Sequence, residues 1–195
     1  MQSAASLRAA PSIVGARVPA SNRAVKVAAR PKAVKVAAEL GVWMVNVHAS
    51  GGSRMMRAAR EALNDLSCPP LLVGVTVLTS MDRDDLAELG CDDEPIDRVC
   101  QLAALAESAG LDGVVCSAAE AAVLSTRQRD GFLLVTPGIR LAGDAAGDQR
   151  RIVTPERAVA DGATHLVVGR SITASDDPAK TAADIRASLD AHASG

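Results

Sequence analysis

Short apolar runs alternate with longer stretches of helical periodicity along the chain from Gly41 onward. Each run is almost continuously apolar, as is typical of strands that are buried on both faces of a parallel sheet. The predicted strands are residues 43–47, 71–77, 113–116, 133–135 and 165–168. The predicted helices are residues 54–66, 82–89, 94–109, 118–127, 155–160 and 178–191. Repeated strand–helix units favour an α/β fold with a parallel sheet.

The ends of the predicted helices carry local signals. Thr154 and Asp177 each precede a proline where a helix begins, which makes them plausible N-caps. Gly90 and Gly110 follow helical stretches and are expected to end them. These signals support the helical reading independently of the hydrophobic pattern.

Five strands suit either an open doubly wound sheet or part of a (β/α)₈ barrel. Both architectures bind ligands beyond the carboxyl ends of their strands. Polar and glycine-rich residues cluster just after the predicted strands, at 48–52, 79–80, 137–140 and 169–173. We therefore expect the functional residues at this edge.

The net charge of −2 combines two unlike segments. Residues 1–38 hold seven basic side chains and no acidic one, whereas residues 39–195 hold 14 basic and 23 acidic side chains. The basic segment is typical of an organellar transit peptide, and equally of a disordered basic tail. The acidic remainder disfavours nucleic-acid binding.

The hexapeptide AVKVAA occurs at 24–29 and again at 33–38, where it leads into Glu39 and is expected to be helical. We accordingly predict a leader over residues 1–32 and a folded body over 33–195. A cleaved transit peptide would direct the chain to a plastid or mitochondrion, and without one it would be cytoplasmic. No apolar stretch reaches the roughly 18 residues of a membrane span, so no membrane partner is expected.

Composition excludes several other classes. With only Trp43 and Phe132 as aromatic residues, the chain lacks stacking platforms for single-stranded nucleic acid. Its four cysteines are 23, 9 and 16 residues apart, a spacing that disfavours a disulfide or zinc framework. Glycine motifs for nucleoside triphosphates or dinucleotides are absent, as is Gly-x-Ser-x-Gly. No metal ligand set is predicted.

Two segments offer chemistry at the strand ends. In HLVVGRSIT (165–173), Gly169 and Arg170 follow a strand, where backbone N–H groups and a guanidinium can bind an oxyanion. A surface arginine beside a turn glycine is the alternative. In the long loop 136–152, Arg140 and Gln149 could reach a phosphate, unless the loop is only a solvated connector. His48 could face a ligand or simply pack.

Six segments together resemble bacterial orotidine 5′-phosphate decarboxylases. They are MVNVHASGG (44–52), VTVLTSMDRDDLAELG (75–90), GLDGVVCSAAEA (110–121), LLVTPGIR (133–140), GDQRRIVTP (147–155) and HLVVGRSIT (165–173). The resemblance covers about residues 33–195, in order and with plausible spacing. It is far more specific than any one of the motifs.

The resemblance implies a (β/α)₈ barrel that acts as a homodimer and converts orotidine 5′-phosphate to UMP and CO₂ without metal or organic cofactor. A sister barrel that acts on sugar phosphates is disfavoured, because TPGIR followed by GDQRR matches the orotidine branch. The residues that match the family's substrate-binding positions are Thr79, Ser80, Arg140, Gln149, Gly169 and Arg170.

The chain departs from the family at the catalytic motif. Family members carry Asp-x-Lys-x-x-Asp on an early strand, and its lysine protonates the reacting carbon. This sequence has four lysines, and none follows an aspartate by two positions. Proton transfer requires a positioned acid, so we assign no catalytic residue and expect little or no decarboxylase activity from an incomplete barrel of about five strands. The alternative is a non-catalytic nucleotide- or phosphate-binding remnant, or an incomplete gene model.

Overall fold

The computed structural model describes residues 25–26, 31–141 and 153–193. Its strands are β1 (Val25–Lys26), β2 (Met44–His48), β3 (Leu71–Val75), β4 (Gly113–Val115), β5 (Leu133–Ile139) and β6 (His165–Val168). Its helices are α1 (Pro31–Glu39), α2 (Gly52–Glu61), α3 (Arg83–Glu88), α4 (Pro95–Ser108), α5 (Ala118–Leu124), α6 (Pro155–Ala160), α7 (Arg170–Thr173) and α8 (Pro178–Ala193), with a 3₁₀ turn at Ala49–Gly51.

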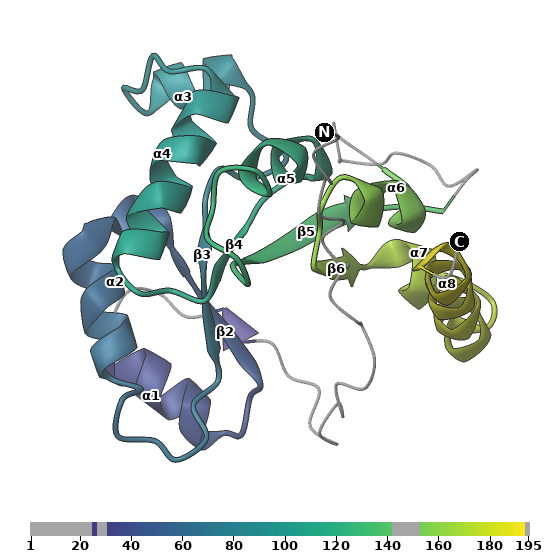
Figure 1. Ribbon diagram of the computed structural model, residues 1–195, viewed down its shortest axis with the longest axis horizontal. Coiled ribbons are helices and arrows are strands. Elements are labelled where there is room, and N and C mark those ends of the chain that lie inside the picture. Colours follow the sequence, from purple (N-terminus) through teal and green to yellow (C-terminus); the bar gives the residue numbers. More distant parts are fainter. Residues whose placement is uncertain (1–24, 27–30, 142–152, 194–195) are drawn as a thin grey trace, which may run out of the picture.

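Strand order decides between the two architectures. The strands form one parallel sheet in the order β1-β2-β3-β4-β5-β6, so neighbours in the sheet are neighbours in the sequence. In a doubly wound sheet, the order in which successive strands are added reverses its direction at a switch point. Right-handed crossovers that always advance in one direction place the helices on one face of the sheet, as Figure 1 shows for α2, α4 and α5. The fold is therefore an α/β, barrel-type fold, of which the described residues form six strands where a closed (β/α)₈ barrel has eight.

The five predicted strands are confirmed as β2 to β6, and β1 is an addition. Residues 25–28 read Val-Lys-Val-Ala, and a lysine within so short an apolar run makes a poor buried strand. Only Val25 and Lys26 form β1, opposite Val45 and Asn46 at the edge of the sheet. An edge strand has a neighbour on one side only, so a short pairing suffices there.

The second AVKVAA copy lies in α1, as predicted. The predicted boundary between the leader and the folded body, after residue 32, falls inside α1. β1 lies before this boundary, within the segment that was predicted to be the leader. Most of residues 1–32 lie outside the described part of the chain, so the interpretation of this segment as a transit-like or disordered leader stays a prediction. None of the described helices is both long and apolar enough to span a membrane.

The six predicted helices form, and their caps agree with the sequence signals. The Thr154 hydroxyl accepts the N–H of Arg157, and the Asp177 carboxylate accepts the N–H of Lys180. Gly90 has a φ of 74°, the left-handed conformation expected beyond a helix end. The short helix α7 is the one that the pattern did not predict.

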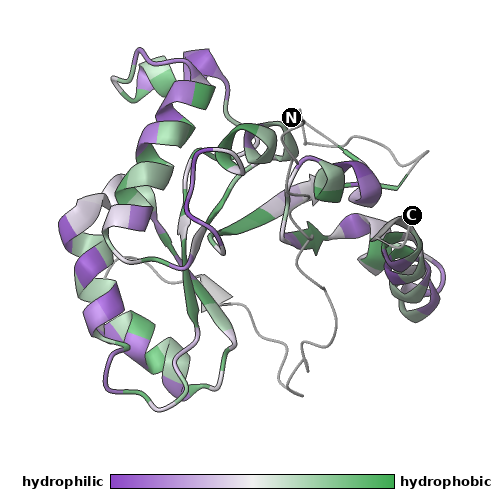
Figure 2. Ribbon diagram, viewed as in Figure 1, coloured by the Kyte–Doolittle hydropathy of each residue, from purple (hydrophilic) through white to green (hydrophobic). Residues whose placement is uncertain are grey.

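The two faces of the sheet bury different sets of residues. On the face toward α2 and α4, residues such as Val45 and Leu72 join the main core. On the opposite face, Met44, Val73 and Val135 form a second, smaller cluster. Figure 2 shows most of the sheet as apolar and the helices as a mixture of apolar and polar residues. Burial on both faces explains why most strands are nearly continuous apolar runs, although β2 carries Asn46 and His48.

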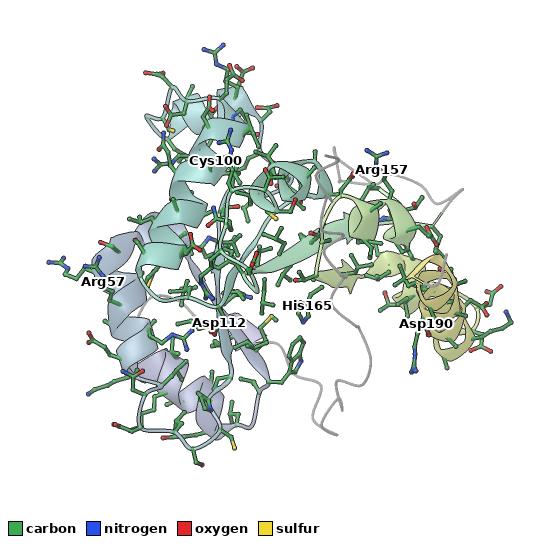
Figure 3. The ribbon with its side chains drawn as sticks, viewed as in Figure 1. Arg57, Cys100, Asp112, Arg157, His165 and Asp190 are labelled. Carbon is green, nitrogen blue, oxygen red and sulfur yellow. The ribbon has the colours of Figure 1, made fainter. Side chains whose placement is uncertain are left out.

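The face away from the helices is concave. Trp43 precedes β2 and His165 begins β6, with three strands between them in the sheet. Their rings nevertheless stack, with centroids 5.8 Å apart and planes inclined by 27°. Figure 3 shows His165 on the side of the sheet opposite α2 and α4. The sheet thus curls as the wall of a barrel does.

Candidate functional site

The parallel strands place the predicted substrate-binding residues at one edge of the sheet. Thr79 and Ser80 follow β3, Arg140 directly follows β5, and Gly169 directly follows β6. Carboxyl ends of neighbouring parallel strands share an edge, which is where ligands bind in such sheets. Gln149 lies outside the described residues.

A bulge near the end of β5 aligns Arg140 with β6. Thr136 pairs with Leu166 and Ile139 pairs with Val168. Between these two pairs, β5 therefore contains one residue more than β6. Gly138 has a φ of 81°, a left-handed conformation that glycine adopts readily. Arg140 and Gly169 are consequently the next residues on two adjacent strands.

Arg140 is buried although it is charged. It is 8% exposed, its Nη1 donates to the Ile139 carbonyl at 2.9 Å, and its backbone N–H donates to the Val153 carbonyl at 3.0 Å. No carboxylate of the described residues forms an ion pair with it. A buried cation is costly unless it is paired. Arg140 is therefore suited to bind an anion.

Gly169 offers accessible backbone next to Arg140. It is exposed, and no heavy atom lies within 4 Å of where a Cβ would stand. Its carbonyl accepts the N–H groups of Ile172 at 2.9 Å and Thr173 at 3.1 Å, which starts α7. Arg170 is the exposed first residue of that helix. The arrangement places Arg140, Arg170 and accessible backbone at adjoining strand ends.

Thr79 and Ser80 belong to the same edge but to a different strand. Thr79 is half-buried and Ser80 is exposed. The turn that carries them is fixed by Thr76, whose hydroxyl donates to the Val115 carbonyl at 2.8 Å. These hydroxyl groups stand two strands away from Arg140 in the sheet order.

Cys116 and Glu120 are buried at this edge, on the helix side of the sheet, and the sequence reading did not single them out. Burial, and then the nearby Glu120 carboxylate, raise the pKa of the Cys116 thiol to about 12. The Glu120 carboxylate accepts the Ser117 N–H at 2.7 Å in a capping box at the start of α5. The Glu120 signal, Ser-x-x-Glu before a helix, is present in the sequence. Both residues serve the packing of α5.

Neither a metal centre nor a disulfide occurs in the described part of the chain. No group of three His, Cys, Asp or Glu residues there is arranged to hold a metal ion. All four cysteines are free thiols.

A half-open hollow of about 310 Å³ lies between α5 and α6. It contains none of the predicted substrate-binding residues. Its lining residues are Ser117, Ala118, Ala119, Ala122, Val153, Arg157 and Asp161. Arg157 and Asp161 already pair with each other at 3.0 Å, so the hollow offers no unpaired charge from this pair.

The fold and the strand-end residues define a barrel-type α/β protein with an anion-suited carboxyl edge. The sequence profile of the Orotidine 5′-phosphate decarboxylase / HUMPS family matches residues 26–185. The chain belongs to this family.

Curated relatives agree with this assignment. The orotidine 5′-phosphate decarboxylase of Pseudomonas fluorescens SBW25 is 60% identical over 154 residues, which cover 78% of this chain and 66% of that protein. The enzyme of Escherichia fergusonii is 58% identical over 157 residues, covering 80% of this chain and 64% of the relative. The chain thus spans just under two thirds of the length of these bacterial relatives.

Solved structures show the same fold. The crystal structure of orotidine 5′-phosphate decarboxylase from Lactobacillus acidophilus has a TM-score of 0.72 and 36% identity, covering 85% of this chain and 73% of that one. The enzyme from Pyrococcus horikoshii OT3 has a TM-score of 0.62 and 20% identity over 86% of this chain and 72% of that one, which supports the fold alone. The resemblance read from the six motifs is confirmed.

Proposed function

We propose that this chain binds a nucleoside 5′-monophosphate of the orotidine 5′-phosphate or UMP type through its phosphate, and that it has little or no decarboxylase activity by itself. The observation that carries the proposal is the buried Arg140 guanidinium, which no described carboxylate pairs with. Gly169 and Arg170 on the adjoining strand end complete the proposed phosphate site.

Family membership supports the choice of ligand. The relatives named above are orotidine 5′-phosphate decarboxylases. Thr79 and Ser80, on the neighbouring part of the edge, are proposed to contact the sugar or base, and Gln149 is proposed to contact the phosphate. A bidentate guanidinium–phosphate contact would supply orientation as well as attraction.

The lack of a suitable acid supports the second half of the proposal. Decarboxylation leaves a carbanion that must be protonated, and no lysine of this sequence stands in an Asp-x-Lys-x-x-Asp motif. Binding energy from a remote phosphate accelerates a reaction only when it is coupled to a reacting centre. Binding is therefore expected without turnover. The likeness to the family also supports a homodimer, with no metal or organic cofactor.

Calorimetric titration with UMP tests the binding. We expect the wild-type chain to bind UMP and Arg140→Ala to weaken binding about 100-fold, since a hydrogen-bonded charge contributes about 1.5–3 kcal/mol. Arg157→Ala is the control, because Arg157 lies on α6 and pairs with Asp161. Unchanged affinity in Arg140→Ala would refute the phosphate site.

A turnover assay with orotidine 5′-phosphate tests the second half. Conversion to UMP, followed by ultraviolet absorbance, should stay at the background level at substrate concentrations that saturate binding. Turnover at a rate typical of enzymes, about 1 s⁻¹ or faster, would contradict the proposal. If the chain shows neither UMP binding nor a cooperative melting transition, the alternative that the sequence comes from an incomplete gene model is favoured instead.

A further inference from the structure

The contact between Trp43 and His165 shows how strongly the sheet is curved. Trp43 directly precedes β2 and His165 begins β6, and these two strands are four positions apart in the sheet. In a flat sheet, four strand spacings would keep them about 19 Å apart. The two ring centroids are instead 5.8 Å apart. Strands four positions apart lie opposite each other in a closed barrel of eight strands, so the curvature of this sheet fits eight strands.

Six strands with this curvature leave the barrel wall open between β6 and β1. The described residues fill six of eight strand positions, so two positions lie between these edges. Among the described strands, β1 pairs only with β2, and β6 pairs only with β5. An edge strand presents a row of backbone N–H and C=O groups to a further strand. We call this two-strand opening the gap.

Exposed apolar side chains lie on both sides of the gap. On the β6 side, Val167 is 49% exposed, whereas Val135 on the neighbouring strand is 5% exposed. Val167 shares the concave face with His165, two residues earlier on β6. On the β1 side, Val36 in α1 is 55% exposed, and Leu40, directly after α1, is 59% exposed. Exposed apolar side chains that gather at one place mark interaction surfaces.

The orientation of α1 turns its exposed apolar side chains toward the gap. Val36 and Leu40 are four residues apart and therefore lie on the same side of the helix. The opposite side carries Ala38, which packs against the main core. Right-handed crossovers place α2 on the Ala38 side of α1. Val36 and Leu40 consequently face the position that a helix preceding α1 would occupy.

We propose that the gap is a docking surface for a second polypeptide that supplies two parallel strand–helix units. Its strands would pair with β6 and β1, and one of its helices would cover Val36 and Leu40. Residues 1–24, which precede β1, are too few to fill both positions, since one strand–helix–strand unit alone takes about 30 residues or more. A second copy of this chain brings a six-stranded sheet, which is too wide for two strand positions.

Complex formation with part of a relative tests the proposal. The probe is the part of the Pseudomonas fluorescens SBW25 enzyme that lies outside its 154 matched residues, about a third of that protein. The full chain, co-expressed with this fragment, should form a 1:1 complex in light scattering. With free fragment at 100 times Kd, the melting temperature of the chain should rise by roughly 5–10 °C. The absence of a complex would overturn the proposal, whether or not the chain binds UMP.

Substitutions on the two sides of the gap locate the contact. Val167→Lys and Leu40→Lys each place a charge against an apolar partner surface, and each should raise the Kd for the fragment about tenfold or more. Leu89→Lys is the matched control, because Leu89 is 73% exposed but follows α3, away from the gap. Its Kd should stay within about twofold of the wild-type value.

Three further results would contradict the docking surface. One is unchanged affinity in both gap variants, and another is an equal loss in all three variants. The third is self-association of the wild-type chain that Val167→Lys abolishes, because a second copy would then occupy the gap. If Val167→Lys does not fold, Leu40→Lys decides, since Leu40 is mostly exposed and lies outside the strands.

Discussion

The two parts of the molecule are packed very differently. The N-terminal part, β2 to β4 with α2 and α4, supplies most of the main core. The C-terminal part, the end of β5 with α6, β6, α7 and α8, has a small cluster around Ile139 and Ala158, and Val167 of β6 is 49% exposed. Figure 1 shows α8 against α6 and α7, away from the other helices. Three of the proposed ligand contacts, Arg140, Gly169 and Arg170, belong to this part.

This difference in packing indicates which part of the molecule holds most of its stability and which part is placed to bind a ligand. The N-terminal part is expected to hold the fold, and the C-terminal part to open first, because local stability follows the density of buried apolar contacts. Ligand-binding segments are commonly drawn from the less stable regions of a protein. A ligand that binds at Arg140 would then stabilise the weaker part selectively.

The largest expected effect comes from two leucines, one in each part, at the second position of β3 and of β6. Leu72 on β3 is fully buried in the main core, whereas Leu166 on β6 is partly buried against the small cluster. Leu72→Ala should cost about 3 kcal/mol of unfolding free energy through lost burial and a cavity. Leu166→Ala should cost about 1 kcal/mol, since less surface returns to water. Urea denaturation measures both, and equal costs would remove the proposed distinction.

A polar network at the amino end of the sheet should show the next largest effect. The Asp112 carboxylate accepts the Leu72 N–H at 2.7 Å and pairs with Arg60 of α2 at 2.6 Å, and the Arg60 Nε donates to the Gly110 carbonyl. Figure 3 places Asp112 near the start of the strands. Asp112→Ala leaves the partly buried Leu72 N–H unpaired, which should cost about 1–3 kcal/mol.

The matched control for this network lies in the C-terminal part. Lys180 and Asp184 pair at 2.6 Å on α8, with both side chains mostly exposed. Asp184→Ala should cost no more than about 0.5 kcal/mol, as exposed helical pairs do. Asp112→Asn keeps an acceptor for Leu72 and should recover part of the loss. A larger loss for Asp184→Ala than for Asp112→Ala in thermal unfolding would reverse the comparison.

The hydrophobic pattern of the sequence was enough to predict the buried strands, but not the short elements that are held by backbone hydrogen bonds alone. β6 begins and ends where predicted, at His165 and Val168, because its apolar run is bounded by polar residues. β5 continues through the Pro137–Gly138 bulge, which periodicity cannot show. β1 and α7 contain too few residues to have a period. They exist through hydrogen bonds to β2 and to the Gly169 carbonyl.

The candidate site was predictable to a similar extent. Motif resemblance led to Thr79, Ser80, Arg140, Gly169 and Arg170, which the fold places at one edge. The burial of Arg140 could not be foreseen, since it depends on which residues of distant segments lie alongside.

The smallest expected effect concerns the stacked pair that joins the two parts. Burial lowers the pKa of His165, whose ring stacks on Trp43 while its Nδ1 lies 3.0 Å from the Thr164 hydroxyl. The unfolded chain therefore takes up the proton more readily than the folded one as pH falls below about 6.5. The stability that this neutral ring contributes is present above that pH and is lost as pH falls through the lowered pKa.

Melting temperatures at pH 7.5 and 5.5 should accordingly drop more in the wild type than in His165→Gln, which cannot titrate. Subtracting the variant removes the contribution of every other group that titrates in this interval. The effect should be modest, because the His165 ring remains partly solvated. If the variant and the wild type lose the same number of degrees, protonation of His165 does not weaken the contact between β2 and β6. The stack would then join the two parts through ring packing alone, independent of pH.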